Sequence, residues 1–161
     1  MKTLLIVVHS MTGGSQHMAA AAAQAAQSEC TVQLKNASDA QAKDVLKADG
    51  ILIVTPENLG SMSGMMKDFF DRVYYDLLDL SNGKPYATMI CAGSDGTGAV
   101  HQIERIATGL RWRAIAPALI INTQAQTRAE ILAPKKLSDQ QQQQCTELGA
   151  TFAAGLSSGI F

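Results

Sequence analysis

Three short segments rich in small polar residues carry most of the side chains in this sequence that could bind a ligand. Each follows a run of apolar residues of strand length and combines glycine with hydroxyl or amide side chains. The segments are 10–15 (SMTGGS), 55–64 (TPENLGSMSG) and 91–98 (CAGSDGTG). Ligands of open parallel sheets bind at the turns beyond the carboxyl ends of the strands. The sequence therefore predicts a binding site built from three loops at one edge of a sheet.

The first segment has the composition of an anion-binding turn. Ser10, Thr12 and Ser15 supply hydroxyl groups, while Gly13 and Gly14 let a ligand approach the backbone closely. An alanine-rich segment follows, so the free N–H groups of a helix N-terminus would face the same anion. The loop has no Lys or Arg and matches neither the Walker A nor the G-x-G-x-x-G spacing. These features favour a monophosphate held by neutral donors over a triphosphate with magnesium, and a turn that merely ends a strand is the alternative.

The order of the predicted elements places all three loops on one edge. Short aliphatic runs alternate with longer segments of helical periodicity, which is typical of a parallel sheet covered by helices on both faces. The predicted strands are Leu4–Val8, Thr31–Leu34, Ile51–Val54, Tyr86–Cys91 and Ala118–Ile121. The predicted helices are Met18–Gln27, a short helix ending at Leu46, Met62–Leu78, one that buries Ile103, Ile106 and Leu110, and a last one after Ser138. We expect an α/β doubly wound five-stranded parallel sheet, with helices on both faces, in a single domain over residues 1–161.

Local signals indicate where several helices begin. Residues 38–41 and 138–141 match the capping-box pattern, and either Ser61 or Ser63 is expected to cap the third helix. Pro117 lies beside the fifth strand and suits an edge position, where a missing backbone donor does little harm. Residues 122–137 follow no clear period, and we expect them to be irregular or partly helical.

Composition narrows the class of protein. The net charge is −1, and no run of Lys or Arg occurs, which argues against nucleic acid or a membrane surface as the main partner. Cys30, Cys91 and Cys145 are far apart and have no metal-ligand spacing, as expected of reduced thiols in a cytoplasmic protein. The first apolar run is too short for a signal peptide, and no stretch reaches membrane-spanning length. We therefore expect a cytoplasmic protein.

The three loops resemble those of a known family. Residues 10–15 resemble the S/T-x-T-G-x-S/T phosphate loop of flavodoxins, and residues 55–72 resemble the ring loop and helix of flavodoxin-like NAD(P)H-dependent quinone and FMN reductases. Residues 91–98 fall where that family has its third flavin loop. The resemblance implies the flavodoxin-like strand order 2-1-3-4-5. The resemblance implies an FMN cofactor that carries the chemistry, with no catalytic side chain. The FMN-binding residues that it implies are Ser10, Met11, Thr12, Gly13, Gly14, Ser15, Pro56, Glu57, Asn58, Leu59, Gly60, Ser61, Gly93, Ser94, Asp95 and Gly96.

The resemblance also implies an activity. We expect an FMN-dependent oxidoreductase that takes hydride from NAD(P)H in a ping-pong cycle and reduces a small-molecule acceptor, either a quinone or a flavin. Electron-carrier flavodoxins usually enclose the ring between aromatic side chains and are strongly acidic. The second and third loops here contain no aromatic residue, so Leu59 and Met62 are expected to cover part of one face. A flavodoxin-type carrier and a cofactor-free binding module are the alternatives, and the acceptor, the nucleotide and any homo-oligomer are left open.

Four further residues have competing interpretations. Asp95 either contacts the ligand or caps the helix that follows it. His9, beside the first loop, is expected to have a structural or solvated role. Cys91 is expected to be a buried strand residue without a basic neighbour. Trp112, between two arginines, is a candidate for the rim of a partner surface.

Overall fold

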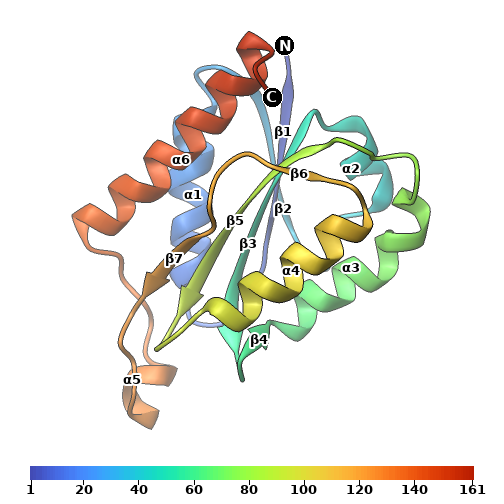
Figure 1. Cartoon of the computed structure of the whole chain (residues 1–161). Helices are drawn as coiled ribbons and strands as arrows, with labels where there is room; N and C mark the ends of the chain where they lie inside the picture. Colours follow the sequence, from blue (N-terminus) through green and yellow to red (C-terminus); the bar gives the residue numbers. More distant parts are fainter.

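A parallel sheet forms the centre of the computed structural model, which describes residues 1–161 (Figure 1). Its main strands are β1 (Thr3–Val8), β2 (Thr31–Asn36), β3 (Gly50–Asn58), β5 (Pro85–Ala92) and β7 (Leu119–Asn122). The order is β2-β1-β3-β5, and the far side of β5 pairs with β7 and with the two-residue β6 (Arg113–Ala114). The predicted order 2-1-3-4-5 is confirmed. The short β4 (Ser61–Met62) adds an antiparallel hairpin to the end of β3.

Helices cover both faces of the sheet (Figure 1). The helices are α1 (Gly14–Ala26), α2 (Ala42–Lys47), α3 (Gly64–Leu77), α4 (Thr97–Gly109), α5 (Arg128–Leu132) and α6 (Asp139–Ser158). Helices α1 and α6 share one apolar core with one face of the strands, while α2, α3 and α4 share another core with the opposite face. None of these helices combines the length and the apolar character that crossing a membrane requires.

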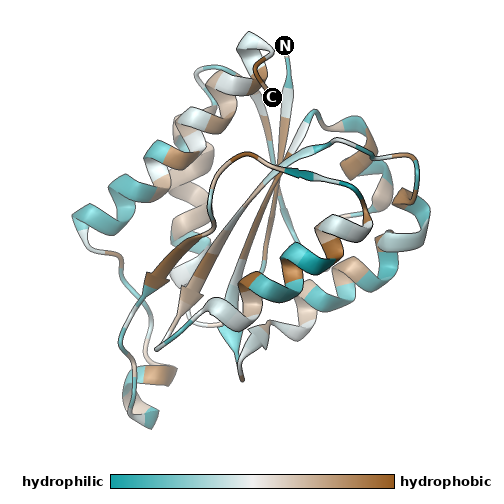
Figure 2. Ribbon diagram, in the orientation of Figure 1, coloured by the Kyte–Doolittle hydropathy of each residue, from teal (hydrophilic) through white to brown (hydrophobic).

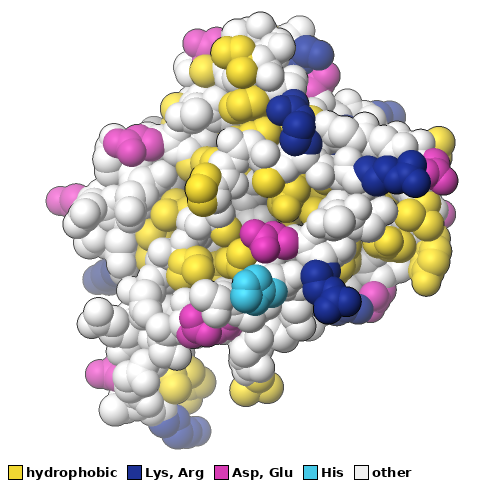
Figure 3. Space-filling model, in the orientation of Figure 1, with side chains coloured by type: hydrophobic (Ala, Val, Ile, Leu, Met, Phe, Trp, Pro, Cys, Tyr) yellow, Lys and Arg dark blue, Asp and Glu magenta, His cyan; other side chains and the backbone are white.

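Strand β1 shows why the strands contain continuous aliphatic runs. Leu5 and Val7 point into the core below α3, while Leu4, Ile6 and Val8 point into the core below α1 and α6. Because both faces are buried, every position from Leu4 to Val8 is apolar, and the usual alternation of polar and apolar residues is lost. The central part of the sheet is accordingly drawn mainly in the brown of hydrophobic residues in Figure 2, whereas charged side chains of both signs are scattered over the face in Figure 3.

Three of the expected helix starts need correction. Helix α1 begins at Gly14, four residues before the predicted Met18. Helix α2 begins at Ala42 with Gln41 as its cap and Asp44 completing the capping box, so the box predicted at 38–41 is wrong. The chain makes a turn before this point, in which the N–H groups of Asp39 and Ala40 both bond to the carbonyl of Asn36. The box predicted at 138–141 is confirmed.

Helix α3 begins later than predicted because residues 61–62 pair with β3. Its cap is Ser63, whose hydroxyl accepts a hydrogen bond from the Met66 N–H at 3.3 Å.

Trp112, a predicted candidate for the rim of a partner surface, is a core residue instead. Its side chain is 7% exposed, and its Nε1–H donates to the Ser81 hydroxyl at 2.9 Å.

The alanine-rich composition of α1 follows from its contact with α6. A Cβ atom added at Gly149 of α6 would lie 2.6 Å from the Cα atom of Ala22 in α1. The backbones of the two helices therefore approach so closely that only glycine fits at this position. Small side chains on α1 allow the same close approach along its length.

A small polar network joins the end of β1 to the start of α3. The Nδ1 atom of His9 lies 2.8 Å from the hydroxyl of Ser63, which lies 3.0 Å from the hydroxyl of Thr55. Since Ser63 also caps α3, the network connects three elements directly below the loops that follow β1 and β3. Burial lowers the pKa of His9 below its usual value, which favours the neutral imidazole. The hydrogen bond to Ser63 supports the structural role expected of His9.

We predict that Gly149→Ala destabilises the protein by about 1–3 kcal/mol, because the added methyl group forces α1 and α6 apart. Urea unfolding followed by circular dichroism would measure this loss. Gly64→Ala is the matched control, since nothing lies within 4 Å of the Cβ position at this helical glycine. Equal midpoints for the two variants would contradict the close contact.

We predict that His9 contributes to a loss of stability on acidification. The unfolded chain binds a proton at His9 more readily than the folded protein does, so stability falls as the pH drops below about 6.5. Urea midpoints at pH 7.5 and 5.5 should therefore differ more for the wild type than for His9→Gln. His101→Gln, which changes an exposed imidazole, should behave as the wild type does. An unchanged pH response in His9→Gln would refute the prediction.

Candidate functional site

The parallel sheet brings the three predicted loops to the same edge. Val8 lies beside Val54, which lies beside Met89, so β1, β3 and β5 run level toward their carboxyl ends. The loops are also in contact with one another. The side-chain amide of Asn58 lies 3.0 Å from the sulfur of Met11, which joins the second loop to the first. This edge is the lower end of the sheet in Figure 1, between the β3–β4 hairpin and α5.

The first loop leads into a helix N-terminus that has no side-chain cap. Gly13 is the N-cap of α1 and has a φ of 98°, a conformation that favours glycine. The hydroxyl of Ser10 accepts a hydrogen bond from the Gly13 N–H at 3.0 Å, which tightens the turn. A Cβ atom at Gly14 would collide with the Cys91 sulfur, so this glycine is also required. The result is a narrow backbone cradle at the start of a 13-residue helix.

Ser15 provides an independent sign that the cradle binds a ligand. Its hydroxyl is buried, the residue is 1% exposed, and the oxygen has no hydrogen-bond partner in the protein. A buried polar atom without a partner is costly, and native proteins rarely retain one without a reason. An oxyanion bound at the N-terminus of α1 would satisfy this hydroxyl together with the free N–H groups of the first helical turn.

The second loop is a tight hairpin. Glu57 pairs with Met62, and Asn58 pairs with Ser61. Leu59 and Gly60 form the two-residue turn, with φ values of 53° and 75°. Positive φ at both central positions is typical of the type I′ turn of hairpins. The hairpin projects from the end of β3 and forms one wall of the ligand edge (Figure 1).

The side chains available to cover a ligand differ from those predicted. Met62 is 2% exposed and belongs to the core, so the expectation that it covers a flavin ring is wrong. The pairing of β4 with β3 turns Met62 inward. Leu59 at the hairpin tip is fully exposed, and Met11 of the first loop is 69% exposed. The apolar side chains at this edge therefore come from the tips of the first and second loops.

The third loop ends at a second helix N-terminus whose own N-cap residue has no side chain. Gly96 is the N-cap of α4 and has a φ of 99°, so it cannot supply a side chain of its own. Asp95 does not act as the N-cap. Its carboxylate instead accepts hydrogen bonds from the Thr97 N–H at 3.4 Å and from the Thr97 hydroxyl at 2.7 Å. The carboxylate of Glu57 fills the empty cap position, accepting from the N–H groups of Gly96 at 2.8 Å and Ala99 at 3.1 Å.

The two helix N-termini at this edge are therefore not equivalent. The N-terminus of α4 already holds a carboxylate, which offsets the positive end of its helix dipole and would repel a second anion. The N-terminus of α1 has neither a side-chain cap nor an acidic residue in its first turn. An anionic ligand at this edge should consequently bind at α1.

The segment between β7 and α6, which sequence patterns left unassigned, supports two of the loops. The Lys135 N–H donates to the carbonyl of Thr12 at 2.8 Å, and its ammonium group binds three carbonyls at the end of α5. Gln126 donates from its side chain to the carbonyl of Gly93 at 3.1 Å, and Asn122 binds the carbonyl of Ser94. The first and third loops are thus braced from outside.

One sequence signal could have revealed part of this segment. Thr127 caps α5, and Glu130 completes a capping box with bonds of 2.9 Å to the N–H groups of Gln126 and Thr127. The T-x-x-E spacing is visible in the sequence. The contact between Lys135 and the first loop has no such signal, because it joins residues more than a hundred positions apart.

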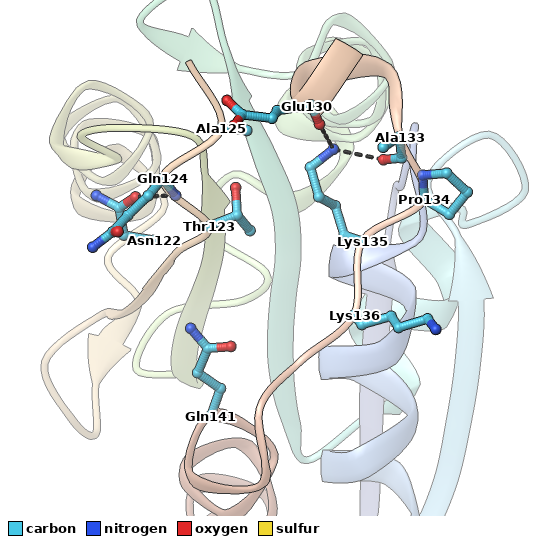
Figure 4. A pocket seen from close by; sticks show the side chains of 10 residues that line it. All are labelled: Asn122, Thr123, Gln124, Ala125, Glu130, Ala133, Pro134, Lys135, Lys136 and Gln141. Carbon is cyan, nitrogen blue, oxygen red and sulfur yellow. Dashed lines mark hydrogen bonds between the residues drawn. The ribbon is translucent and has the colours of Figure 1, made fainter. Parts of the chain in front are cut away.

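A cavity of about 530 Å³ opens beside this segment (Figure 4). Its lining is mostly polar, and it joins the end of β7, the α5 segment and the start of α6. The lining residues are Asn122, Thr123, Gln124, Ala125, Glu130, Ala133, Pro134, Lys135, Lys136 and Gln141. In Figure 4 the Lys135 ammonium group points toward the end of α5, where it donates hydrogen bonds to backbone carbonyls, and so it does not point into the cavity.

The buried cysteines offer no nucleophile. Burial raises the pKa of Cys91, although the charge of Lys135 opposes the rise, so a basic neighbour exists that sequence did not predict. Burial, with a smaller contribution from Cys91, raises the pKa of Cys145 to about 11. Both groups are therefore neutral thiols at physiological pH. No cluster of His, Cys, Asp and Glu side chains could hold a metal ion.

Comparison with known proteins agrees with this geometry. A flavodoxin from Aquifex aeolicus is 38% identical over 100 residues, which cover 61% of this chain and 54% of that protein. The match thus spans about half the length of that relative. A flavodoxin structure from the domain Archaea superposes with a TM-score of 0.79 at 22% identity, covering 97% of this chain and 99% of that one. A flavodoxin, WrbA-like protein from Agrobacterium tumefaciens superposes with a TM-score of 0.73 at 17% identity, covering 98% and 99%.

The structural likenesses establish the flavodoxin-like fold, and the family assignment comes from sequence. The model of the family described as NADPH-dependent FMN reductase matches residues 28–126, which is more than half of the chain. This range includes the second and third loops with the elements that position them. The chain belongs to the NADPH-dependent FMN reductase family, on a flavodoxin-like fold.

Proposed function

We propose that the protein binds FMN across its three loops and acts as an NAD(P)H-dependent oxidoreductase that reduces a quinone, a flavin or a similar small-molecule acceptor. One observation carries the proposal. The cradle at α1 combines an uncapped helix N-terminus with the buried, unpartnered hydroxyl of Ser15. The cradle lies beside the hairpin, which corresponds to the flavin-ring loop of the family. Family membership supports the same cofactor.

The residues at the edge fit FMN part by part. The phosphate would bind at Ser10–Ser15, where the N-terminus of α1 has no side-chain cap and the Ser15 hydroxyl has no partner. The ring would lie between the hairpin of residues 56–61 and the third loop, residues 93–96. The side chains of Met11 and Leu59 are exposed on the tips of the first two loops and are available to contact it. The chain thus supplies polar donors for the phosphate and a mostly non-aromatic border for the ring.

FMN bound here would supply hydride acceptance from a nicotinamide and electron delivery to the acceptor. The chain itself would bind and orient the two partners. The ionisable side chains at this edge are already engaged. His9 is held by Ser63, the carboxylates of Glu57 and Asp95 accept hydrogen bonds at the start of α4, and the thiol of Cys91 is buried and neutral. The absence of aromatic side chains in the second and third loops leaves room for a substrate to approach one face of the ring.

A flavodoxin-type electron carrier is the second candidate, and the 38% identity to the Aquifex aeolicus flavodoxin favours it. Two features oppose it. The net charge of −1 provides little attraction for a basic redox partner, and the loops do not enclose the ring between aromatic side chains. The two functions differ in a simple way, since only the reductase should oxidise a nicotinamide nucleotide at a useful rate.

Titration of the purified protein with FMN, followed by anaerobic addition of NADPH and then NADH, tests the proposal. We expect a bound-flavin absorbance spectrum that bleaches rapidly with one of the nucleotides. Bound flavin that responds to neither nucleotide would favour the carrier. Failure to bind FMN would refute both functions and leave the cofactor-free binding module.

We predict that Ser15→Ala weakens FMN binding by about 10- to 100-fold, the range expected for one hydrogen bond to a charged group. The variant should not lower the stability of the protein without FMN, because it removes a buried hydroxyl that has no partner. Flavin fluorescence titration and urea unfolding measure the two effects. Ser28→Ala, at an exposed site outside the cradle, is the control. Unchanged FMN affinity in Ser15→Ala would exclude the cradle as the phosphate site.

A further inference from the structure

Glu57 lies in the ring loop, yet its carboxylate is not directed at an open ligand site. It accepts hydrogen bonds from the backbone N–H groups of Gly96 and Ala99, at 2.8 and 3.1 Å. These N–H groups belong to the cap and first turn of α4, whose own N-cap residue is a glycine. Glu57 therefore caps α4, although it lies 39 residues before Gly96 in the chain.

Two further contacts join the same hairpin to α4. The N–H of Met62 donates to the side-chain oxygen of Gln102 at 2.9 Å. Gly98 lies so close to the carbonyl of Gly60 that a Cβ atom at residue 98 would collide with it. The hairpin thus lies directly on the first turns of α4. Both its outer strand and its turn are held there.

The tip of the hairpin has little other support. Leu59 is fully exposed, and nothing lies within 4 Å of the Cβ position at Gly60. The turn is not anchored by apolar burial, so its position depends on polar contacts near its base. Among these contacts, only the hydrogen bonds accepted by Glu57 join an ionised side chain to a helix N-terminus. Such charge-assisted hydrogen bonds are stronger than hydrogen bonds between neutral groups.

We propose that Glu57 is a positioning residue for the flavin ring, holding the second and third loops together as one preformed unit. The inference rests on the proposed function, because it concerns the part of FMN that these two loops would contact. Loops already held in the binding geometry lose less conformational freedom when a ligand binds, so affinity rises. Glu57 acts through α4 and the hairpin, and need not touch the flavin.

Riboflavin separates this role from phosphate binding, because it has the ring and lacks the phosphate. Glu57→Ala should weaken the binding of FMN and riboflavin by the same factor, about tenfold, the size of effect seen when a helix cap is lost. Glu57→Gln should fall between Glu57→Ala and the wild type, since its amide oxygen can still accept one N–H bond. Ser15→Ala should instead weaken FMN binding far more than riboflavin binding. Flavin fluorescence titrations of each variant with both ligands give these ratios.

Glu104→Gln is the matched control, because it removes an exposed carboxylate from α4 without touching the hairpin. It should bind both flavins as the wild type does. Unchanged affinities in Glu57→Ala would overturn the proposal. So would a loss confined to FMN, because Glu57 would then act on the phosphate and not on the ring.

A second measurement does not depend on any flavin. Amide hydrogen exchange should be faster at Gly96 and Ala99 in Glu57→Ala, while the amides of β1 keep their protection. Unchanged exchange at these two amides would show that Glu57 does not cap α4, and would overturn the proposal at its structural step. If the wild type bound neither flavin, the proposed function and the ring role of Glu57 would both fail. Faster exchange would then still establish the cap.

Gly98→Ala provides an independent way to disturb the same contact, since the added methyl group displaces the carbonyl of Gly60. We expect it to weaken the binding of both flavins, and to have little further effect when combined with Glu57→Ala, because both changes separate the hairpin from α4. Gly64→Ala is the control, at a helical glycine with open space around it. Fully additive effects in the double variant would contradict a shared mechanism.

Discussion

The burial of both faces of a parallel sheet is the constraint on which the rest of this structure depends. Helices cover both faces, so the central part of β1, β3 and β5 is mostly apolar and has little room for polar ligand-binding side chains. Polar function is therefore confined to the ends of the strands. Because β1, β3 and β5 are parallel and in level register, their three polar loops meet at a single edge. The site is thus a consequence of topology, and its details lie in how the loops are held.

Charge then distinguishes two helix N-termini that have nearly the same backbone geometry. Gly13 and Gly96 have φ values of 98° and 99° and cap α1 and α4 without a side chain. Glu57 occupies the second of these termini, whereas the first has only neutral donors and an unpartnered hydroxyl at Ser15. One negative charge within the protein thereby leaves α1 as the favourable position for an external anion. The same carboxylate joins the ring loop to its neighbour, so a single residue contributes to both selectivity and shape.

The loops are also supported from outside, which bears on the choice between a reductase and a carrier. Lys135 holds the first loop through the carbonyl of Thr12, and Gln126 holds the third loop through the carbonyl of Gly93. These contacts keep the backbone in place without placing large aromatic side chains over the ligand edge. Under the proposed reductase function, a backbone held in this way would leave one face of the cofactor accessible to two substrates in turn.

The sequence by itself determined the strands and the three loops, because aliphatic runs and glycine-rich turns are local patterns with few structural solutions. The strand order came from the resemblance of the loops to those of flavodoxins. The sequence also predicted an anion-binding turn at Ser15 and its neighbours, and the structure places this turn at the N-terminus of α1. Tertiary structure alone decided what each loop residue contacts. Glu57, expected beside a ligand, caps α4, and Met62, expected over a ring, is buried in the core. Lys135 reaches the first loop from a segment with no assigned pattern. These contacts join residues far apart in the chain, and hydrogen-bonding partners at such separations leave no periodic signal in the sequence.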